Sequence, residues 1–425
     1  MKNVPLKYMS VISLGKMLQS TPARADQEVF PYLKASTLTE NGLDLSSLQQ
    51  MPFSRREQEI LQLQKDDVVV VEGGSIGRSA WISEDMAGIY FQNSINRVRP
   101  KIFADGRYLK YTIESRRASG FFDAITNQAT IRHLTADKLA NTPVPYLNQE
   151  RQRKIADYLD HETAEIDAFV ASSENFHRLA NERHLAEVES EVWNEGYPLV
   201  RIKFITDVLP GFSFRSGDYK EYSEGAVRLL RGINVTPGEI NWGNCVALPE
   251  TESRNYYEYL LRTGDFVLGL DRPIVGSGLR LAEIDEESEG SLLVQRVARI
   301  RLTSGMVLRR WLYAALQGTR FEAHLTPSFT GVSVPHMSPG QLENFAIPVP
   351  LPETQNAKLR ILSRASEQHA LLEKDISAAI SLARERRAAL ITAAVTGQID
   401  VTAKNKPAAE QLEDDVAQGL HREYA

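Results

Sequence analysis

The sequence contains the same long pattern twice, and this internal repeat constrains the fold more than any local motif does. The segment YLKASTLTENGLD, from Tyr32, aligns with LLRGINVTPGEIN, from Leu229. Further along, IRHLTADKLANTPVP aligns with VPHMSPGQLENFAIPVP, so that His133 faces His336 and both copies close on Pro-Val-Pro. The chain is therefore predicted to contain two similarly folded domains.

Each Pro-Val-Pro is followed by a long stretch without glycine or proline. In residues 149–191 and 353–395, apolar residues recur at spacings of three, four and seven, which predicts two helices, each roughly 65 Å long. We expect these helices to lie against each other as a coiled coil, the alternative being that each packs on its own domain. The residues predicted to pair the helices are Ile155, Leu159, Ile166, Phe169 and Phe176 in the first and Leu362, Leu372, Ile376, Ile380 and Leu390 in the second.

These patterns divide the chain into five predicted parts. They are a first domain (1–147), a first long helix (148–194), a second domain (195–351), a second long helix (352–397) and a polar C-terminal tail (398–425). Within each domain, short runs rich in Val, Ile and Leu alternate with turn signals and a few helical stretches, which is typical of an α+β fold.

The stretch VVVVEGGSIGRSAW, residues 68–81, has the look of a phosphate-binding loop. Such a loop needs Gly-x-x-x-x-Gly-Lys-Ser/Thr, but here the glycine spacing is too short and Arg78 stands where lysine is required. The second copy replaces Gly-Gly-Ser with Asp271-Arg272-Pro273. A change of this kind within one chain favours a scaffold turn over a nucleotide site.

The composition is that of a globular protein, with 42% hydrophobic and 24% charged residues among 425. No apolar run approaches the ~20 residues that cross a bilayer, so no membrane association is predicted. The single cysteine, Cys245, cannot form an internal disulfide, and we expect a cytoplasmic location.

Positive charge is gathered in matching places although the net charge is −6. Nine Lys or Arg residues and four acids lie between Arg97 and Lys138, and six arginines and no acid lie between Arg296 and Arg320. The pairing predicts two surfaces that neutralise phosphates, the alternative being ordinary solvated side chains on strands.

Catalytic and metal-binding motifs are missing from the sequence. It has no Asn/Asp-Pro-Pro-aromatic stretch, no His-Glu-x-x-His and no nuclease-like Asp with a following Glu-x-Lys. His133 and His336 are lone histidines and are expected to be structural. No catalytic residue, metal ligand or bound cofactor is predicted for this chain.

Three segments resemble the specificity subunit of a type I restriction-modification system: TIRHLTADKLANTPVP, QERQRKIADYLDHETAEIDAF from Gln149, and ERRAALITAAVTGQIDV from Glu385. The resemblance extends to about residue 401. The second helix departs from it, because PETQNAKLRILSRASEQHALLEKDI keeps the apolar spacing but not the usual Gln-Ile-Ala-x-x-Leu-Asp pattern.

The resemblance implies two target-recognition domains and two conserved helices that pair antiparallel. It also implies a subunit without activity of its own that reads the two halves of a split, asymmetric site in double-stranded DNA. Its partners would be two methyltransferase subunits and, in the restriction enzyme, two ATP-driven motor and nuclease subunits. S-adenosylmethionine, ATP and Mg²⁺ would then belong to the partners.

Candidate DNA-contacting residues follow from repeat equivalence and loop character, because base edges are read by polar side chains while arginines position phosphates. They are Lys34, Ser36, Ser75, Arg78, Thr130 and Arg132 in the first domain and Arg231, Asn234, Arg272, Ser277, Ser333 and His336 in the second.

Two other functions remain open at this point. One is a two-domain enzyme that uses the glycine turn or the histidines, and it would bind ATP or S-adenosylmethionine. The other is a coiled-coil interaction protein that does not touch DNA. Only a DNA reader should bind DNA with an affinity that falls steeply with salt.

Overall fold

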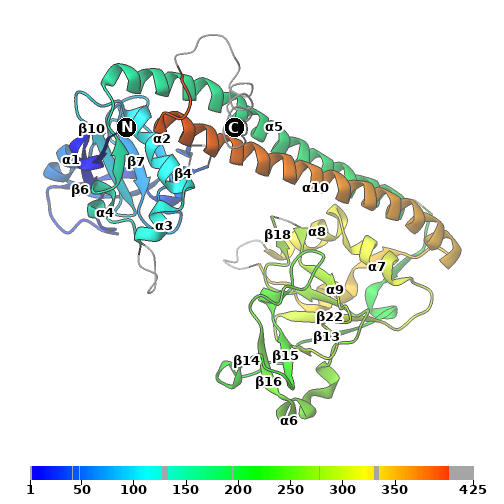
Figure 1. The fold of residues 1–425 in the computed structure, drawn as a ribbon. Helices are drawn as coiled ribbons and strands as arrows, with labels where there is room; N and C mark the ends of the chain where they lie inside the picture. The colour runs from blue at the N-terminus through cyan, green and yellow to red at the C-terminus, as the bar shows by residue number, and fades with distance from the viewer. Residues whose placement is uncertain are drawn as a thin grey trace. The chain divides into compact units, whose positions relative to one another are not determined.

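The computed structural model describes residues 2–40, 42–46, 48–126, 133–193, 196–276, 278–329 and 335–401. The chain divides into two compact units: unit 1 comprises Met1–Asn175 with Ile376–Ala425, and unit 2 comprises Phe176–Asp375. Both boundaries fall inside the two long helices, so each helix contributes one part to each unit (Figure 1).

Unit 1 is built on a four-stranded antiparallel sheet in the order β2-β10-β7-β8. These strands span Ser10–Leu14, Ile95–Pro100, Val68–Val71 and Ser79–Trp81. A three-stranded sheet, β6-β3-β9, spans Gln49–Ser54, Gln27–Leu33 and Tyr90–Phe91. Two short pairs complete the unit: β1 (Asn3–Pro5) with β11 (Pro143–Pro145), and β4 (Leu38–Thr39) with β5 (Gly42–Leu43). The four valines of β7 are all buried, which explains the uninterrupted apolar run.

Unit 2 repeats the four-stranded antiparallel sheet of unit 1, whereas its second sheet has four strands instead of three. Its sheet β13-β22-β17-β20 spans Thr206–Pro210, Val297–Leu302, Phe266–Gly269 and Leu281–Glu283. The sheet β14-β16-β15-β21 spans Lys220–Glu221, Val246–Pro249, Ala226–Leu230 and Leu292–Leu293. The short pairs are β12 (Leu199–Arg201) with β23 (Ala346–Pro348), and β18 (Ile274–Val275) with β19 (Gly278–Leu279). In both units one strand pair is parallel, β3 with β9 and β15 with β21. The predicted α+β class with two similar domains is confirmed.

The helices also follow the repeat. The α-helices are α1 (Arg55–Leu61), α2 (Gly106–Ala118), α3 (Phe121–Ile125), α4 (Ala136–Ala140), α5 (Gln149–Val192), α6 (Glu250–Ser253), α7 (Arg309–Leu316), α8 (Thr319–Leu325), α9 (Pro339–Asn344) and α10 (Pro352–Thr396). The 3₁₀ turns are η1 (Leu6–Tyr8), η2 (Ala35–Thr37), η3 (Ile202–Phe204), η4 (Ser216–Asp218), η5 (Gly232–Asn234), η6 (Arg254–Tyr259) and η7 (Thr326–Phe329). Gly397 follows α10 with φ +74°, a backbone conformation that suits glycine at a helix end.

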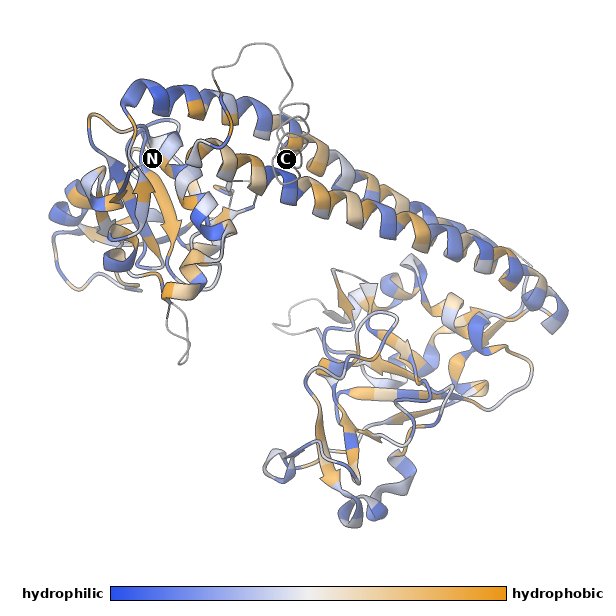
Figure 2. Cartoon of the chain, in the orientation of Figure 1, coloured by the Kyte–Doolittle hydropathy of each residue, from blue (hydrophilic) through white to orange (hydrophobic). Residues whose placement is uncertain are grey.

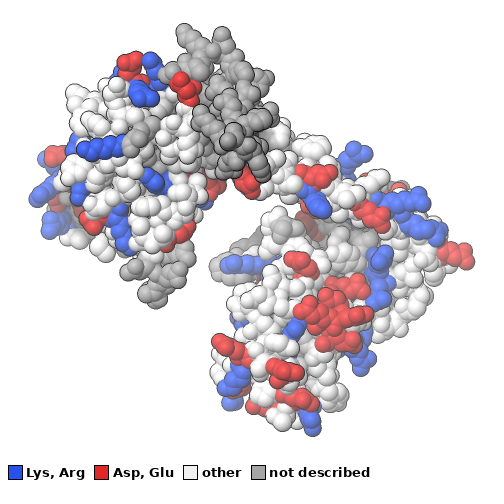
Figure 3. Space-filling view, in the orientation of Figure 1, with Lys and Arg blue, Asp and Glu red and all other residues white. Residues whose placement is uncertain are grey.

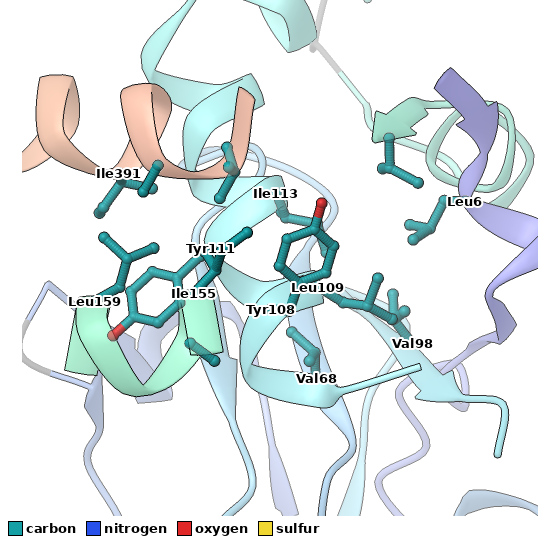
Figure 4. Close-up of a cluster of buried hydrophobic side chains, with 14 of the residues drawn as sticks. Leu6, Val68, Val98, Tyr108, Leu109, Tyr111, Ile113, Ile155, Leu159 and Ile391 are labelled. Carbon is teal, nitrogen blue, oxygen red and sulfur yellow. The ribbon is translucent and has the colours of Figure 1, made fainter. Parts of the chain in front are cut away.

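The core of unit 1 lies between α2, the four-stranded sheet and the long helices. Tyr108 and Leu109 of α2, both fully buried, belong to the same cluster as Leu159 of α5 and Ile391 of α10 (Figure 4). Tyr111 Oη donates to Asp160 Oδ1 at 2.7 Å, which adds a polar tie between α2 and α5. Figure 2 shows apolar residues concentrated in the strands of each unit, as expected for sheets that form a core.

A buried glutamine in the first turn of each long helix fastens that helix to its domain. Gln152 Nε2 donates to the carbonyl oxygens of Leu147 and Phe103, and its Oε1 accepts from the backbone N–H of Asp105 at 3.0 Å. Gln355 makes the same three bonds, from Nε2 to Pro350 and Met306 and from Leu308 N–H to its Oε1. Both glutamines are fully buried. The loop before α2 or α7 is thus fixed to the helix that follows the domain.

The long helices run antiparallel within each unit. In unit 1, Arg387 pairs with Asp167 and Arg384 with Glu174. In unit 2, His177 contacts Glu373 at 3.1 Å, while Lys358 pairs with Glu191 at 2.5 Å. In both cases the α5 number rises as the α10 number falls, which requires opposite chain directions.

Seven of the ten predicted helix-pairing residues are buried or partly buried, but Phe169, Phe176 and Leu372 are not. They are 50%, 52% and 36% exposed. Their place in the helix contact stays a prediction, and each of the three side chains is exposed. The reason for the exposure is the 3.6-residue turn: after Leu159 the buried positions continue through Thr163 to Val170, so Phe169 lies about 100° away from the buried face. The other seven are Ile155, Leu159, Ile166, Leu362, Ile376, Ile380 and Leu390.

Replacing Gln152 with alanine is expected to lower the free energy of unfolding by about 1–3 kcal/mol, because it leaves one backbone N–H and two carbonyl groups, one of them buried, without their partner. Urea denaturation followed by circular dichroism measures the change. Arg153→Ala, an exposed position on the same helical turn, is the control. An equal effect of the two substitutions would show that the glutamine bonds contribute nothing specific.

Candidate nucleic-acid interface

A matched loop follows the central strand of the second sheet in each unit: η2 after β3 and η5 after β15. In unit 1, Thr37 N–H donates to Lys34 O at 2.9 Å and Thr37 Oγ1 accepts from Lys34 N–H at 3.2 Å. In unit 2, Asn234 N–H donates to Arg231 O at 2.9 Å and Asn234 Oδ1 accepts from Arg231 N–H at 3.1 Å. The same backbone turn is therefore closed by two different side chains.

In each unit, an arginine of the neighbouring hairpin donates a hydrogen bond to the residue that follows the 3₁₀ turn. Arg78 Nη1 donates to Leu38 O, and Arg280 Nε donates to Val235 O, both at 3.0 Å. Arg280 Nη1 also donates to Asp271 O at 2.9 Å. Each arginine is only partly exposed. These bonds fix the end of each 3₁₀ turn to the strand-turn-strand element that the sequence predicted as scaffold.

The segment before each Pro-Val-Pro lies beside the turn of the same hairpin. Gly73 forms an isolated antiparallel bridge with His133, and Asp271 forms the corresponding bridge with His336. His336 Nδ1 lies 2.6 Å from Asp271 Oδ1, and Arg296 pairs with the other oxygen of Asp271 at 3.0 Å. In each unit, the described residue at the start of this segment, His133 or His336, therefore lies against the turn of the hairpin.

The predicted contact residues do not all face outward. Ser36 and Arg272 are exposed, Lys34 and Ser75 are partly exposed, and the side chain of His336 is 54% exposed. Asn234 is 1% exposed, and its Nδ2 donates to the carbonyl oxygens of Asn241 and Asn244. Its predicted role in reading base edges is wrong, because every polar atom of its amide is bonded inside the protein. Thr130, Arg132, Ser277 and Ser333 lie outside the described residues.

Arg78 and Arg231 are likewise bonded within their own units. Arg78 Nη2 donates to Glu40 Oε1 at 2.5 Å, and Arg231 Nη2 donates to the backbone and side-chain oxygens of Asn244, both at 2.8 Å. Their side chains position the loops. Arg280 was not among the residues predicted from the sequence. The pattern Arg-x-Ala, which occurs at Arg78–Ala80 and again at Arg280–Ala282, could have identified it as the counterpart of Arg78.

The arginines of the central strands are structural, which corrects the prediction that they neutralise phosphates. Arg97 and Arg299 are each 4% exposed, and burial lowers the pKa of Arg97 to about 10. Arg97 Nη1 donates to Ile60 O at 2.8 Å. Arg99 and Arg301 form two-bond ion pairs with the buried carboxylates of Asp67 and Asp265. The two arginines of each strand are two residues apart, so they share one face of β10 or β22.

Figure 3 shows a dense group of acidic side chains on the face of unit 2 that it presents. Unit 2 also has five exposed carboxylates in the segment 283–289: Glu283, Asp285, Glu286, Glu287 and Glu289. Such a face repels a phosphate backbone. Among the described residues, no group of three or more His, Cys, Asp or Glu side chains is placed to hold a metal ion.

Residues 1–168 match the family model of the type I restriction modification DNA specificity domain. The chain is 25% identical over 316 residues to the type I restriction enzyme MjaVIII specificity subunit of Methanocaldococcus jannaschii, a match that covers 69% of this chain and 70% of that protein. It is 33% identical over 173 residues to the Escherichia coli EcoAI specificity subunit, covering 41% of this chain and 28% of that protein. Together these matches support a type I restriction enzyme specificity subunit.

The same fold occurs in a solved structure that concerns complex assembly and conformational transition of the type I R-M system. The TM-score is 0.57 at 16% identity, over 94% of this specificity subunit and 98% of that chain. The crystal structure of the HsdS subunit from Thermoanaerobacter tengcongensis also matches, with a TM-score of 0.39 at 15% identity over 94% and 97% of the two chains. Within the described residues of the specificity subunit, no helix is both long and apolar enough to pass through a bilayer.

A chain of ion pairs ties the η2 loop of the specificity subunit to α2. Glu40 accepts from Arg117 on α2 at 3.1 and 3.3 Å and from Arg78 behind the loop. The hydrogen bonds from Arg117, more than those from Arg78, lower the pKa of Glu40 to about 2. A cavity of about 490 Å³, lined by Glu40 and Arg117 and by Arg387 of α10, separates the loop from the long helices. The ion pairs of Glu40 therefore fix the segment after η2 beside this cavity.

Glu40→Gln is expected to make unit 1 less stable at pH 7, by less than about 1 kcal/mol because the carboxylate is 55% exposed. The pKa of Glu40 is depressed in the folded state, so its stabilising effect is present above the unfolded value of about 4.5 and is lost as the pH falls toward about 2. Thermal unfolding of wild type and variant between pH 3 and pH 7 should show the two curves converging at low pH. A difference that stays constant over this range would contradict the assignment.

Proposed function

We propose that this chain is a non-catalytic, sequence-specific DNA-binding subunit in which each unit reads one half of a bipartite, asymmetric site in double-stranded DNA. The observation that carries this proposal is the pair of matched loops. The backbone turns of the two loops are closed by equivalent hydrogen bonds, whereas the side chains that the loops expose differ. Two copies of one reading element with different outward side chains are what two unlike half-sites require.

The surface around the loops supplies cations for phosphate contacts. Lys34 and Arg272 lie at the two loop regions and form no ion pair with another described residue. The strand arginines are buried or held in ion pairs, so phosphate binding is assigned to these loop cations and to backbone N–H groups. This limited set fits a protein whose net charge is −6, because binding then depends on local placement of charge and not on an overall basic surface.

The long helices offer a surface to other chains. α5 exposes Phe169, Phe176 and Leu179, at 50%, 52% and 47%, and α10 exposes Leu371 and Leu382 at 65% and 67%. Phe169 and Phe176 are seven residues apart and therefore share one helix face. We assign these exposed apolar residues to contacts with partner subunits: two methyltransferase subunits and, in the restriction complex, the ATP-dependent motor and nuclease subunits. S-adenosylmethionine, ATP and Mg²⁺ are assigned to those partners.

DNA binding by the full chain is the direct test. Binding of a randomised duplex pool, measured by filter retention between 50 and 200 mM salt, should weaken steeply as salt rises, since each phosphate contact contributes a slope of about −0.9 in log K against log salt. Lys34→Ala and Arg272→Ala should each reduce the slope, whereas Glu286→Gln in the acidic segment 283–289 serves as the control. Absent or salt-independent binding would refute the proposal.

The distance between the readers should depend on the helices. Removing residues 172–178 and 374–380 takes one heptad from each helix and shortens both by about 10.5 Å. Because seven residues make almost two full turns, the same helix faces still meet after the deletion. At about 3.4 Å per base pair, the preferred gap between half-sites should shrink by roughly three base pairs while the half-sites stay the same. Selection of preferred sites from a randomised duplex pool by wild type and variant measures the gap. An unchanged gap would show that the helices do not set it.

A further inference from the structure

The two matched loops expose different chemistry at the same position. The middle residue of η2 is Ser36 and that of η5 is Ile233, and both are exposed. Ile233 is 61% exposed, although an isoleucine gains free energy from burial. The equivalence does not depend on sequence alone, because the residue after each is held in the same way: Asp44 N–H donates to Thr37 O and Asn241 N–H donates to Asn234 O, each at 2.8 Å.

The polar neighbours of Ile233 are occupied within unit 2. Arg231 is bonded to Asn244, and the amide of Asn234 is fully bonded and buried. Arg280 donates a hydrogen bond to the backbone oxygen of Val235, which follows the turn. A Cβ on Gly232 would lie 3.6 Å from Arg280 Nη2. In this turn the side chain of Ile233 is therefore the one that is free to meet a ligand, and it is presented on a rigid backbone.

We propose that Ile233 is a specificity-determining residue of the second reader and that it contacts the C5-methyl group of a thymine in the major groove. This inference rests on the proposed function. An aliphatic side chain offers no hydrogen bond, and the thymine methyl group is the apolar feature that a base edge displays in the major groove. Ser36 at the matching position of the first reader carries a hydroxyl that donates or accepts, so it suits a different base edge.

The test begins with the full chain and a duplex that carries its selected bipartite site. Each thymine of both half-sites is replaced, one at a time, by deoxyuridine, which removes the C5-methyl group and leaves the hydrogen-bonding edge unchanged. At one position the wild-type chain should bind about fourfold more weakly, the loss expected for one methyl-sized apolar contact. The variant Ile233→Ser should bind thymine and deoxyuridine equally there.

Ile102→Ser is the matched control, because Ile102 is 94% exposed in unit 1 but lies outside the matched loops. It should keep the wild-type response to deoxyuridine. Thermal unfolding should be unchanged in both variants, since both side chains are exposed. If no thymine position loses its methyl effect in Ile233→Ser, or if the selected site contains no thymine, the inference is overturned.

The reciprocal change separates this inference from the proposed function. Ser36→Ile should alter the bases selected in one half-site, and Ile233→Ser should alter those selected in the other. Both variants leaving both half-sites unchanged would overturn the role of this position while leaving the DNA-reading function intact. Failure of the wild-type chain to select any bipartite site would instead refute the proposed function itself.

Discussion

The rest of the structure depends on the buried glutamine at the start of each long helix. A side-chain amide in a closed interior has to bond all of its polar groups, and Gln152 and Gln355 do so with the backbone on both sides of the domain-to-helix junction. Because a buried partner lost here is costly, the helix cannot pivot freely on its domain. A reader held in this way presents its loop in a fixed orientation relative to its own helix segment.

Arginine serves three different purposes in this chain. On the central strands, Arg97 and Arg299 donate to backbone carbonyl groups, and next to them Arg99 and Arg301 neutralise buried carboxylates. Behind the loops, Arg78 and Arg280 position a turn. At the loop surface, Arg272 is exposed. The guanidinium group is suited to the first two purposes because its fork of donors can bind two acceptors at once. A count of arginines therefore overstates the surface that is available to DNA.

Much of the architecture could be predicted because periodicity and repetition are properties of the chain. The duplication, the α+β class and the two long helices follow from pattern, and residues 73–78 connect β7 to β8 as the predicted strand-turn-strand element does. The individual contact residues were less predictable. Asn234 and Ile233 are neighbours in a polar loop, and no pattern distinguishes the one that is bonded inward from the one that is exposed.

The sequence by itself determined that two like domains alternate with two long helices, because hydrophobic spacing reflects secondary structure directly. Only the tertiary structure decided which side chains reach the surface. Burial depends on segments brought together from distant parts of the chain, as when Asn241 and Asn244 close around Asn234 and Asp67 meets Arg99. A one-residue shift along a helix moves a side chain by about 100°, which is why Phe169 is exposed and Val170 is buried.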